Sequence, residues 1–500
     1  MKYFILFFLL SVSVIELTAQ PGTVIMTPQS AIPLTLMRIK VPAKFSTLID
    51  SNKMVSIATG FEPHVFYMGG LTKPRFMAFS PEGVLHVIDN KINGAVYALP
   101  DTNMDDVADT LLKVVSGVNG HDFKFYKGSI YVAEMTQILK CSDLDQDGFF
   151  ETKEVFISGI PGGGHSSRTI VFDSVNHKMY LSIGSSCNVC RETGRADIER
   201  FNDDGTGKKV FATGTRNAVG LTLHPKTNKL WANNNGSDNQ GNNVPPEWID
   251  VIREDGFYGH PFVYANQVWF NMEINNDYKA LKPITAADSS RVAGMYEPAA
   301  LIQSHSAPMA MEYADLSGDI IGKKGFVMAL RGSWNRSPAT GYKLVFLSQQ
   351  NEEDKINTVS DFLTGFLTDS LSSTTKYWAR PVGLAVQKKG SLTHIFMSSD
   401  NANTFILKLK DVRVNGLNEV RSMPLKIFPN PFKNLIQIEG VLPLNATLVL
   451  YNLMGEEQTV SINSEAKVID TGNLVPGIYF LKISAGNKTF THKIFRINEY

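Results

Sequence analysis

A short sequence phrase occurs six times along this chain. Each copy has a polar or basic residue, an apolar-alternating strand, a turn of Pro, Gly, Asn or Lys residues, and a second strand. The copies begin at Arg75, His121, Arg168, Arg216, His305 and Arg380. The first four begin roughly 46–50 residues apart, which is the period of a propeller blade. The repeat therefore predicts an all-β fold, with a six-bladed β-propeller at about residues 57–412 after a lead-in at residues 20–56 that we expect to be irregular.

The start of each copy predicts where the functional residues lie. A propeller brings the beginning of each innermost strand to one face, around the central channel. The residues that begin the copies are therefore predicted to form a ring, joined by His165 before the third strand and Arg331 at the end of a second strand. Several arginines in one ring predict an anionic ligand, because a guanidinium group matches a carboxylate through two parallel hydrogen bonds. The alternative is a set of structural salt bridges, but Asp89 and Glu134 are among the few carboxylates expected there.

His165 is the residue of this ring best suited to proton transfer. It follows three glycines, residues 162–164, which allow the backbone to approach closely. A histidine at the channel face can act as a general base near neutral pH. The alternative is a loop histidine that only makes structural hydrogen bonds.

Two oxygen-rich segments are candidate calcium sites. Asp143, Asp145, Asp147 and Glu154 fit the loop pattern D-x-D-x-D-G-x₅-E, but the flanking sequences predict strands, so we expect a structural calcium loop at an outer blade edge. Residues 101–109 are a degraded copy of this loop, with a solvated acidic turn as the alternative. Residues 233–238 offer Asn, Gly and Ser oxygens, although such clusters are more often turns.

Composition and the N-terminal segment exclude some functions. The formal net charge is zero, so there is no general attraction to nucleic acid. Residues 1–19 read as a secretory signal peptide; a membrane anchor is the alternative, but the apolar run is short for one. Cys187 and Cys190 could close a local disulfide in an oxidising compartment and leave Cys141 free, or all three could be thiols.

The sequence changes character after about residue 411. Residues 413–424 predict a linker, and residues 425–500 carry short alternating strands that predict a small β-sandwich. The phrases IFPNP, LYNLMGE and LVPGIYFLKI resemble the C-terminal sorting domain of type IX secretion cargo in Bacteroidetes. The resemblance implies the type IX machinery as partner and export through the periplasm to the cell surface or medium. The alternative is a generic adhesive sandwich.

The predicted propeller resembles the soluble quinoprotein sugar dehydrogenases of the glucose/sorbosone dehydrogenase family, and the sorbosone-type branch in particular. The phrases that carry the resemblance are GGGHSSRTIVFD, ATGTRNAVGLTLHP, SHSAPMAMEY, LRGSWNRSPATGYKL and ARPVGLAV. The resemblance implies a PQQ-dependent oxidoreductase with Ca²⁺ beside the quinone. The implied partners are a small sugar, an aldose or related sugar aldehyde, and an electron acceptor of unspecified identity.

The resemblance also implies roles for individual residues. His165 matches the base that takes a proton from the anomeric hydroxyl, and Arg216 the arginine near the quinone carbonyls. The implied cofactor-binding residues are Asn217, His305, Arg331 and Arg380, and Gly236 and Ser237 fall where backbone carbonyls hold Ca²⁺.

Two departures from the family keep other functions open. The glucose enzymes carry an aspartate that orients the base where this chain has Ser185, Ser186 and Cys187, and the second of their paired arginines falls near Trp378. A non-catalytic carbohydrate-binding propeller therefore remains an alternative. A calcium-dependent lactonase-like hydrolase is another, although it needs an acidic metal site and this ring is basic.

Overall fold

The structure is a computed structural model of the whole chain. It describes residues 22–316, 322–350, 353–371, 374–412, 426–440, 446–452, 455–463, 467–472, 474–485 and 488–497. The chain divides into two compact units, Met1–Arg413 and Val414–Tyr500. The predicted signal peptide and linker lie outside the described residues. Within the described ranges, no helix has the length and apolar character needed to cross a membrane.

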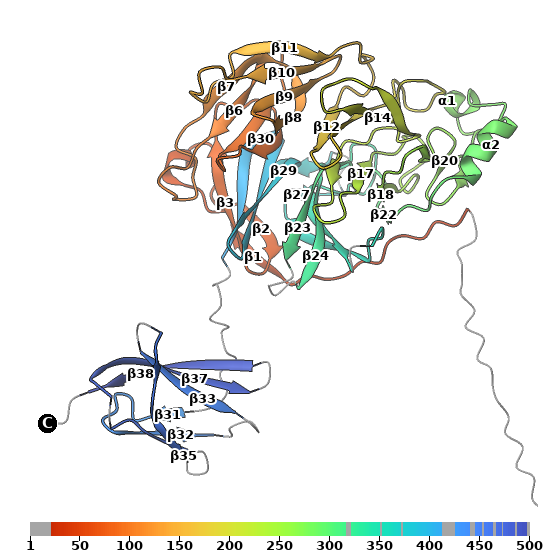
Figure 1. Cartoon of the computed structure of the whole chain (residues 1–500). Helices are drawn as coiled ribbons and strands as arrows, with labels where there is room; N and C mark the ends of the chain where they lie inside the picture. The colour runs from red at the N-terminus through yellow and green to blue at the C-terminus, as the bar shows by residue number, and fades with distance from the viewer. Residues whose placement is uncertain are drawn as a thin grey trace, which may run out of the picture. The chain divides into compact units, whose positions relative to one another are not determined.

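Four sheets of the first unit follow one another along the chain (Figure 1). The first has the order β4 (Pro74–Phe79), β5 (Leu85–Asp89), β6 (Gly94–Leu99), β7 (Leu112–Val118), and the second β8 (Gly120–Tyr126), β9 (Ser129–Glu134), β10 (Ile138–Ser142), β11 (Thr152–Ile157). The third is β12 (Arg168–Asp173), β13 (Lys178–Ile183), β14 (Asp197–Asn202), β15 (Lys209–Thr213) and β19 (Gly256–Phe257). The fourth is β16 (Leu221–Leu223), β17 (Leu230–Asn234), β18 (Glu247–Val251), β22 (Ala300–Ile302).

Two further sheets combine strands from distant parts of the sequence. One joins β23 (Pro308–Leu316), β24 (Lys323–Leu330), β25 (Lys343–Gln349) and β26 (Thr358–Thr364) to β2 (Met54–Ala58) and β1 (Leu34–Arg38). The other joins β29 (Ala379–Lys389) and β30 (Leu392–Asp411) to β3 (Phe61–Met68). Smaller elements are η1 (Ala43–Phe45) and the pair β27 (Leu367–Asp369) and β28 (Lys376–Tyr377).

The expectation of an irregular lead-in is wrong for β1 and β2. β1 is largely exposed and lacks a clear alternation of apolar and polar residues, so its sequence carries little strand signal. Backbone pairing supplies the strand instead, because β2 pairs with β26 and β1 adds to the sheet by pairing with β2.

The first strands of the six sheets form a closed circuit. β4 contacts β8, β8 contacts β12, and the series continues through β16, β23 and β29 back to β4. In each sheet the register brings the start of the first strand beside the end of the second; Pro74 pairs with Asp89, and Arg168 with Ile183. Residues at these two kinds of position therefore gather at one end of the circuit, which is the arrangement that the repeat predicts.

The long segment between the fourth and fifth copies contains several short regular elements. It contains the hairpin β20 (Val263–Tyr264) and β21 (Val268–Trp269), and helices α1 (Asn276–Lys279) and α2 (Ala286–Ala293). Figure 1 places both helices at the edge of the first unit, near β20. Phe262, Tyr278 and Val292 pack in one buried cluster of this insert, and Val189 joins them from another loop. α2 begins with a capping box at Thr285. This helix signal is easily missed in a segment rich in Tyr, Asn and Pro.

The described residues of the second unit form two four-stranded sheets. One is β31 (Lys426–Phe428), β32 (Leu435–Glu439), β36 (Val468–Asp470), β35 (Ser461–Asn463), and the other β34 (Glu457–Gln458), β33 (Thr447–Asn452), β37 (Gly477–Ala485), β38 (Lys488–Arg496). Both sheets contribute to one apolar cluster that includes Ile436, Leu450 and Leu481.

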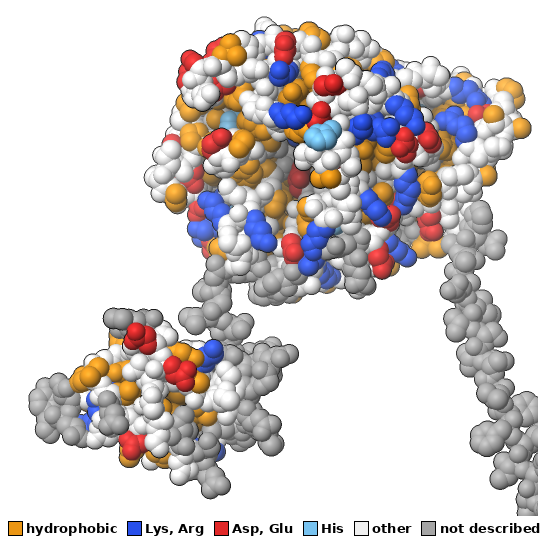
Figure 2. Space-filling view, viewed as in Figure 1, with side chains coloured by type: hydrophobic (Ala, Val, Ile, Leu, Met, Phe, Trp, Pro, Cys, Tyr) orange, Lys and Arg blue, Asp and Glu red, His pale blue; other side chains and the backbone are white. Residues whose placement is uncertain are grey.

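Charges of both signs are mixed over the face of the first unit drawn in Figure 2. This mixing agrees with the zero net charge of the chain. On that face there is no broad field of one sign that would attract a charged polymer.

Candidate active site

His165 lies in the loop before β12, where its imidazole is half-buried. Its Nδ1 is 2.7 Å from the carbonyl oxygen of Ser185, and its backbone N–H donates to the same oxygen at 3.0 Å. Because a carbonyl can only accept, Nδ1 carries the proton and Nε2 carries the lone pair. Burial, and then the charge of Arg216, lower the pKa of His165 below its ordinary value. The imidazole is therefore neutral near pH 7, with Nε2 able to accept a proton.

Glycines and a buried arginine fix this loop. Gly164 has φ +62°, and a Cβ there would come within 2.3 Å of the Cα of Ser186. A Cβ on Gly184 would come within 2.7 Å of the Cβ of His165. Arg168 is fully buried and donates to three loop carbonyls, those of Pro161, His165 and Ser167, each at 2.7 Å. Arg168 thus anchors the loop rather than facing the channel with the other members of the predicted ring.

Arg216 is buried, and its guanidinium group donates hydrogen bonds to neighbouring loops. Its Nε donates to the carbonyl of Asn188 at 3.0 Å, and one terminal nitrogen donates to the carbonyl of Asn235 at 3.1 Å. The other terminal nitrogen reaches Oδ1 of Asn188 at 3.1 Å and Oδ2 of Asp238 at 3.3 Å. The adjacent Asn217 receives a backbone anchor, because its N–H donates to Oδ1 of Asn234 at 2.9 Å.

Asp238 links Arg216 to His305, and sequence reasoning missed it as a site residue. Besides its ion pair with Arg216, its Oδ1 accepts from the side chain of Asn335 and lies 4.0 Å from Nδ1 of His305. His305 in turn donates from Nε2 to the carbonyl of Gly241 at 3.0 Å. The available signal was that Asp238 ends the Asn-, Gly- and Ser-rich run, directly after Ser237.

The predicted calcium residues Gly236 and Ser237 are hydrogen-bonded to Glu247 and Tyr278, respectively. The N–H of Gly236 donates to Oε2 of Glu247 at 2.6 Å, and a Cβ on Gly236 would meet Pro245 at 2.5 Å, so only glycine fits. Tyr278 donates to the hydroxyl of Ser237 at 2.8 Å. Burial raises the pKa of Glu247 to about 7. A cation beside this stretch would find carboxylate oxygens as well as backbone carbonyls.

A second group contains the other predicted cofactor residues. The Nε–H of Arg331 is shared between the two carboxylate oxygens of Asp400, at 3.0 and 3.2 Å, and Asp400 also pairs with Arg75 at 3.1 Å. Arg380 donates to the carbonyls of Arg331 and Gly332 at 3.0 and 2.5 Å. The alternative of structural salt bridges is thus correct in part, because Asp400 at the end of the sixth copy was overlooked.

This group keeps a surplus of positive charge. The charges of Arg75, Arg331 and Asp400 all act on Lys73, and those of Arg331 and Arg380 act on Arg75. Burial lowers the pKa of Arg75 to about 10, so it remains charged. Lys73, Arg75, Arg331 and Arg380 therefore surround Asp400, while the nearby carboxylate of Asp89 accepts the backbone N–H of Lys73 and pairs with Lys91 at 2.9 Å. An anion would relieve the mutual repulsion of the four cations.

The two groups are contiguous. The N–H of Arg331 donates to the carbonyl of Ala307 at 2.9 Å, and that of Gly332 to Ser306 at 3.0 Å. His305 and Arg331 are therefore neighbours at the same end of the circuit. His121, another member of the predicted ring, packs on the ring of Phe76 with 4.5 Å between centroids and is almost fully buried.

The acidic loop lies at the opposite end of its sheet, between β10 and β11. Asp143, Asp145 and Asp147 gather as predicted, with ligand oxygens within 4.8 Å of one another, but the fourth carboxylate of the set is Glu151. The inclusion of Glu154 is wrong: it lies on β11, directly opposite Lys140, and pairs with it at 2.9 Å. The pattern assumes a helix after the loop, whereas a strand carries its twelfth residue away from the centre.

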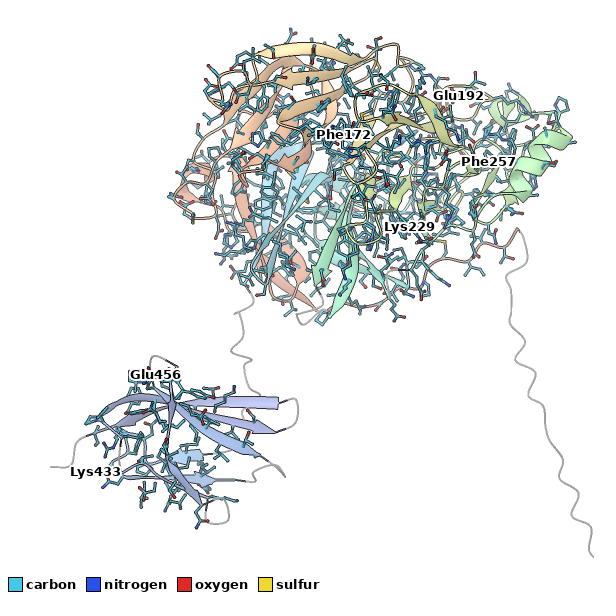
Figure 3. All side chains as sticks on the ribbon, in the orientation of Figure 1. Phe172, Glu192, Lys229, Phe257, Lys433 and Glu456 are labelled. Atoms are coloured by element: carbon cyan, nitrogen blue, oxygen red, sulfur yellow. A yellow bond between two sulfur atoms is a disulfide. The ribbon has the colours of Figure 1, made fainter. Side chains whose placement is uncertain are left out.

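Cys187 and Cys190 form a disulfide, and Cys141 is a free, buried thiol whose pKa burial raises to about 12. The disulfide lies in the loop after β13 that also contains Ser185 and Glu192; Glu192 is labelled in Figure 3. Glu192 accepts from the N–H of Ser186 at 3.1 Å and from its hydroxyl at 2.8 Å.

Residues 426–498 match the secretion system C-terminal sorting domain. This domain indicates that the protein is exported and is secreted or held at the cell surface.

Relatives match the rest of the chain. An uncharacterized protein of Borreliella burgdorferi is 27% identical over 353 residues, covering 68% of this chain and 87% of that protein. A pyrroloquinoline quinone-dependent pyranose dehydrogenase of Coprinopsis cinerea is 24% identical over 410 residues. That match covers 71% of this chain and 54% of the dehydrogenase, so the chain spans about half the length of this relative.

Solved structures share the fold. The holo form of the pyranose dehydrogenase PQQ domain from Coprinopsis cinerea has a TM-score of 0.60 at 20% identity, covering 75% of this chain and all of that one. The calcium structure of a family AA12 enzyme from Trichoderma reesei has a TM-score of 0.59 at 20% identity, covering 71% and 96%. Residues 55–410, more than half of the chain, match the TrAA12-like family, and the chain therefore belongs to that family, whose relatives include PQQ-dependent sugar dehydrogenases.

Proposed function

We propose that this protein is a secreted quinoprotein that oxidises an aldose or a related sugar aldehyde, of the sorbosone type, with PQQ as hydride acceptor. We further propose that each of the six sheets is one propeller blade and that residues 425–500 form a β-sandwich. The observation that carries the function is the imidazole of His165, whose Nδ1 is held 2.7 Å from the carbonyl of Ser185 at the same end of the circuit as a cationic group.

His165 would act as the base. With Nδ1–H donated to Ser185, the lone pair of Nε2 is free to take the proton of an anomeric hydroxyl. Arg216 favours the neutral base before the transfer, because its charge lowers the pKa of His165. In this reading the carbonyl of Ser185 orients the imidazole, in the role that an aspartate plays in the glucose enzymes.

The cationic group fits the cofactor. PQQ is a tricarboxylate, and Arg331, Arg380, Arg75 and Lys73 together hold more positive charge than Asp400 balances. Arg331 and Arg380 would bind the carboxylates, and Asn217 and His305 would contribute on the other side. When bound, PQQ would accept the hydride that leaves the sugar carbon as its hydroxyl loses a proton.

Gly236 and Ser237 would hold Ca²⁺. Their backbone carbonyls are hard oxygen donors, and the carboxylates of Asp238 and Glu247 lie beside this stretch. Glu247 fixes the backbone at Gly236, and Tyr278 donates to the hydroxyl of Ser237 and to the carbonyl of Asp238, each at 2.8 Å.

The test is reconstitution. Purified protein is mixed with PQQ and Ca²⁺, and reduction of an electron-accepting dye is followed with a panel of sugars. We expect dye reduction that requires both additions and at least one aldose. PQQ binding without dye reduction for any sugar would contradict the enzymatic proposal and favour the non-catalytic carbohydrate-binding alternative.

A further inference from the structure

The disulfide between Cys187 and Cys190 encloses Asn188 and Val189, and Asn188 faces the site. Its carbonyl accepts from Nε of Arg216 at 3.0 Å, and its Oδ1 accepts from a terminal nitrogen of Arg216 at 3.1 Å. The same Oδ1 accepts from the N–H of Asp238 at 2.7 Å, and its Nδ2 donates to the carbonyl of Asp238 at 3.2 Å. One asparagine thus binds both partners of the Arg216–Asp238 ion pair.

The same loop holds the base. Ser185 accepts from Nδ1 and from the N–H of His165 through its carbonyl. Its hydroxyl donates to the carbonyl of Cys187 at 2.9 Å and lies 3.2 Å from the N–H of Cys187. The residue that orients His165 is therefore bonded directly to the first half of the disulfide.

The outer side of the loop is fixed to the insert. Val189 packs in the buried cluster of the insert with Phe262 and Tyr278. Arg191, next to the disulfide, pairs with Asp288 through two contacts of 2.9 Å. None of the described residues 184–196 belongs to a helix or strand, so side-chain contacts and the disulfide have to hold this segment in place.

We propose that the Cys187–Cys190 loop is a positioning device for the site, with Asn188 as the positioning residue that sets Arg216 and Asp238 relative to His165. The inference rests on the proposed function for its catalytic meaning. The geometry itself does not depend on it, and the test below separates the two.

The first arm of the test uses apoprotein, because PQQ itself reacts with thiols. Histidines are labelled with ¹⁵N, the His165 resonances are assigned by their loss in His165→Gln, and the pKa is measured by titration. In Asn188→Ala and in the double variant C187S/C190S, Arg216 is released, and the pKa of His165 should rise by about half a unit or more. Asp238, Glu192 and His260 also act electrostatically with His165, so a parallel titration of His260 reports whether the whole site has shifted.

Two controls separate an effect of the Cys187–Cys190 loop from general effects of cysteine substitution. Cys141→Ser removes a cysteine outside the loop and should leave the pKa of His165 unchanged. A phosphine reductant should shift the wild-type value as the double variant does, and it should not affect the double variant. An unchanged His165 pKa in folded Asn188→Ala and C187S/C190S proteins would overturn the proposal. If the double variant does not fold, Asn188→Ala, which retains the disulfide, decides the outcome.

The second arm uses reconstituted enzyme. Asn188→Ala should lower kcat by about tenfold to a hundredfold with a smaller change in KM, because misplaced groups cost rate more than binding. An unchanged kcat in Asn188→Ala would refute the positioning role. If the wild type lacks PQQ-dependent activity, the proposed function fails, whereas the His165 titration still decides whether the loop positions the site.

Discussion

The single Nε–H of Arg331 is shared between the two carboxylate oxygens of Asp400, at 3.0 and 3.2 Å, at the end of the strand circuit where the candidate site lies. The aspartate is almost fully buried, and it also pairs with the buried Arg75. One carboxylate therefore holds two cations of the proposed cofactor-binding group in place, so that this group is formed before any ligand arrives.

Asp400→Asn should destabilise the fold by about 3–5 kcal/mol, because it leaves buried Arg75 without a counter-charge. Urea unfolding measures the change. Asp361→Asn is the matched control, since it breaks a partly exposed pair with Lys343 at 2.5 Å and should cost about 0–1 kcal/mol. Equal losses in the two variants would contradict the assignment of Asp400 as a buried counter-charge.

His165→Ala should reduce kcat of the reconstituted enzyme by about 10²–10⁴, the usual contribution of a general base. PQQ affinity, measured by titration of the cofactor absorbance, should change little because the cationic group is intact. His177→Ala serves as control, since its side chain is exposed on a turn of the same sheet. Wild-type turnover in the His165 variant would remove this residue from the mechanism.

Stability should fall as pH decreases from about 6.5 to about 4, in part because of His394. This buried ring accepts the N–H of Asp411 at 3.0 Å through Nδ1, and burial lowers its pKa to about 4. The unfolded chain takes up the proton near pH 6.5 and the folded chain only near pH 4. The contribution is complete above about pH 6.5 and is lost as pH falls, by an amount on the order of 3 kcal/mol.

Urea unfolding at several pH values tests the role of His394. The variant His394→Gln should have a flatter dependence of unfolding free energy on pH, whereas the exposed His177→Gln should keep the wild-type slope. A wild-type slope in His394→Gln would assign the pH dependence to other groups.

The acidic loop should bind Ca²⁺ in the absence of PQQ, and calorimetry of the apoprotein should record this event. Asp145→Ala and Glu151→Gln should weaken it and reduce the calcium-dependent gain in Tm. Glu154→Gln should not, because Glu154 pairs with Lys140 on the neighbouring strand. A loss in Glu154→Gln but not in Glu151→Gln would restore the ligand set that the sequence pattern predicts.

Removal of the second unit, from about Leu425 onward, should leave the first unit folded and trap it in the periplasm. Each unit has its own apolar clusters, and the sorting domain is the export signal. Circular dichroism checks folding, and fractionation of a type IX-competent bacterium checks location. Normal export of the truncated protein would contradict the sorting role.

Local pattern was enough to predict the repeated strand pairs and the residues that begin them. His165, Arg216, Arg331 and Arg380 could be named because strand alternation and turn residues are encoded within a few positions of one another. The same holds for the aspartates of residues 143–147. It fails for Glu154, where a contact between neighbouring strands overrides the motif.

The sequence by itself determined the all-β repeat, the two-part organisation and most of the basic residues of the site. Only the tertiary structure decided which carboxylates meet them, because Asp400 reaches Arg75 and Arg331 from another sheet, and Asp238 meets His305 from another loop. The same is true of β2, which pairs with β26 some 300 residues away, and of β1, which extends the sheet by pairing with β2. A sequence pattern reports only on residues that are close along the chain. Ion pairs and the contacts of Asn188 depend instead on the closed circuit of strands, which brings separate loops together.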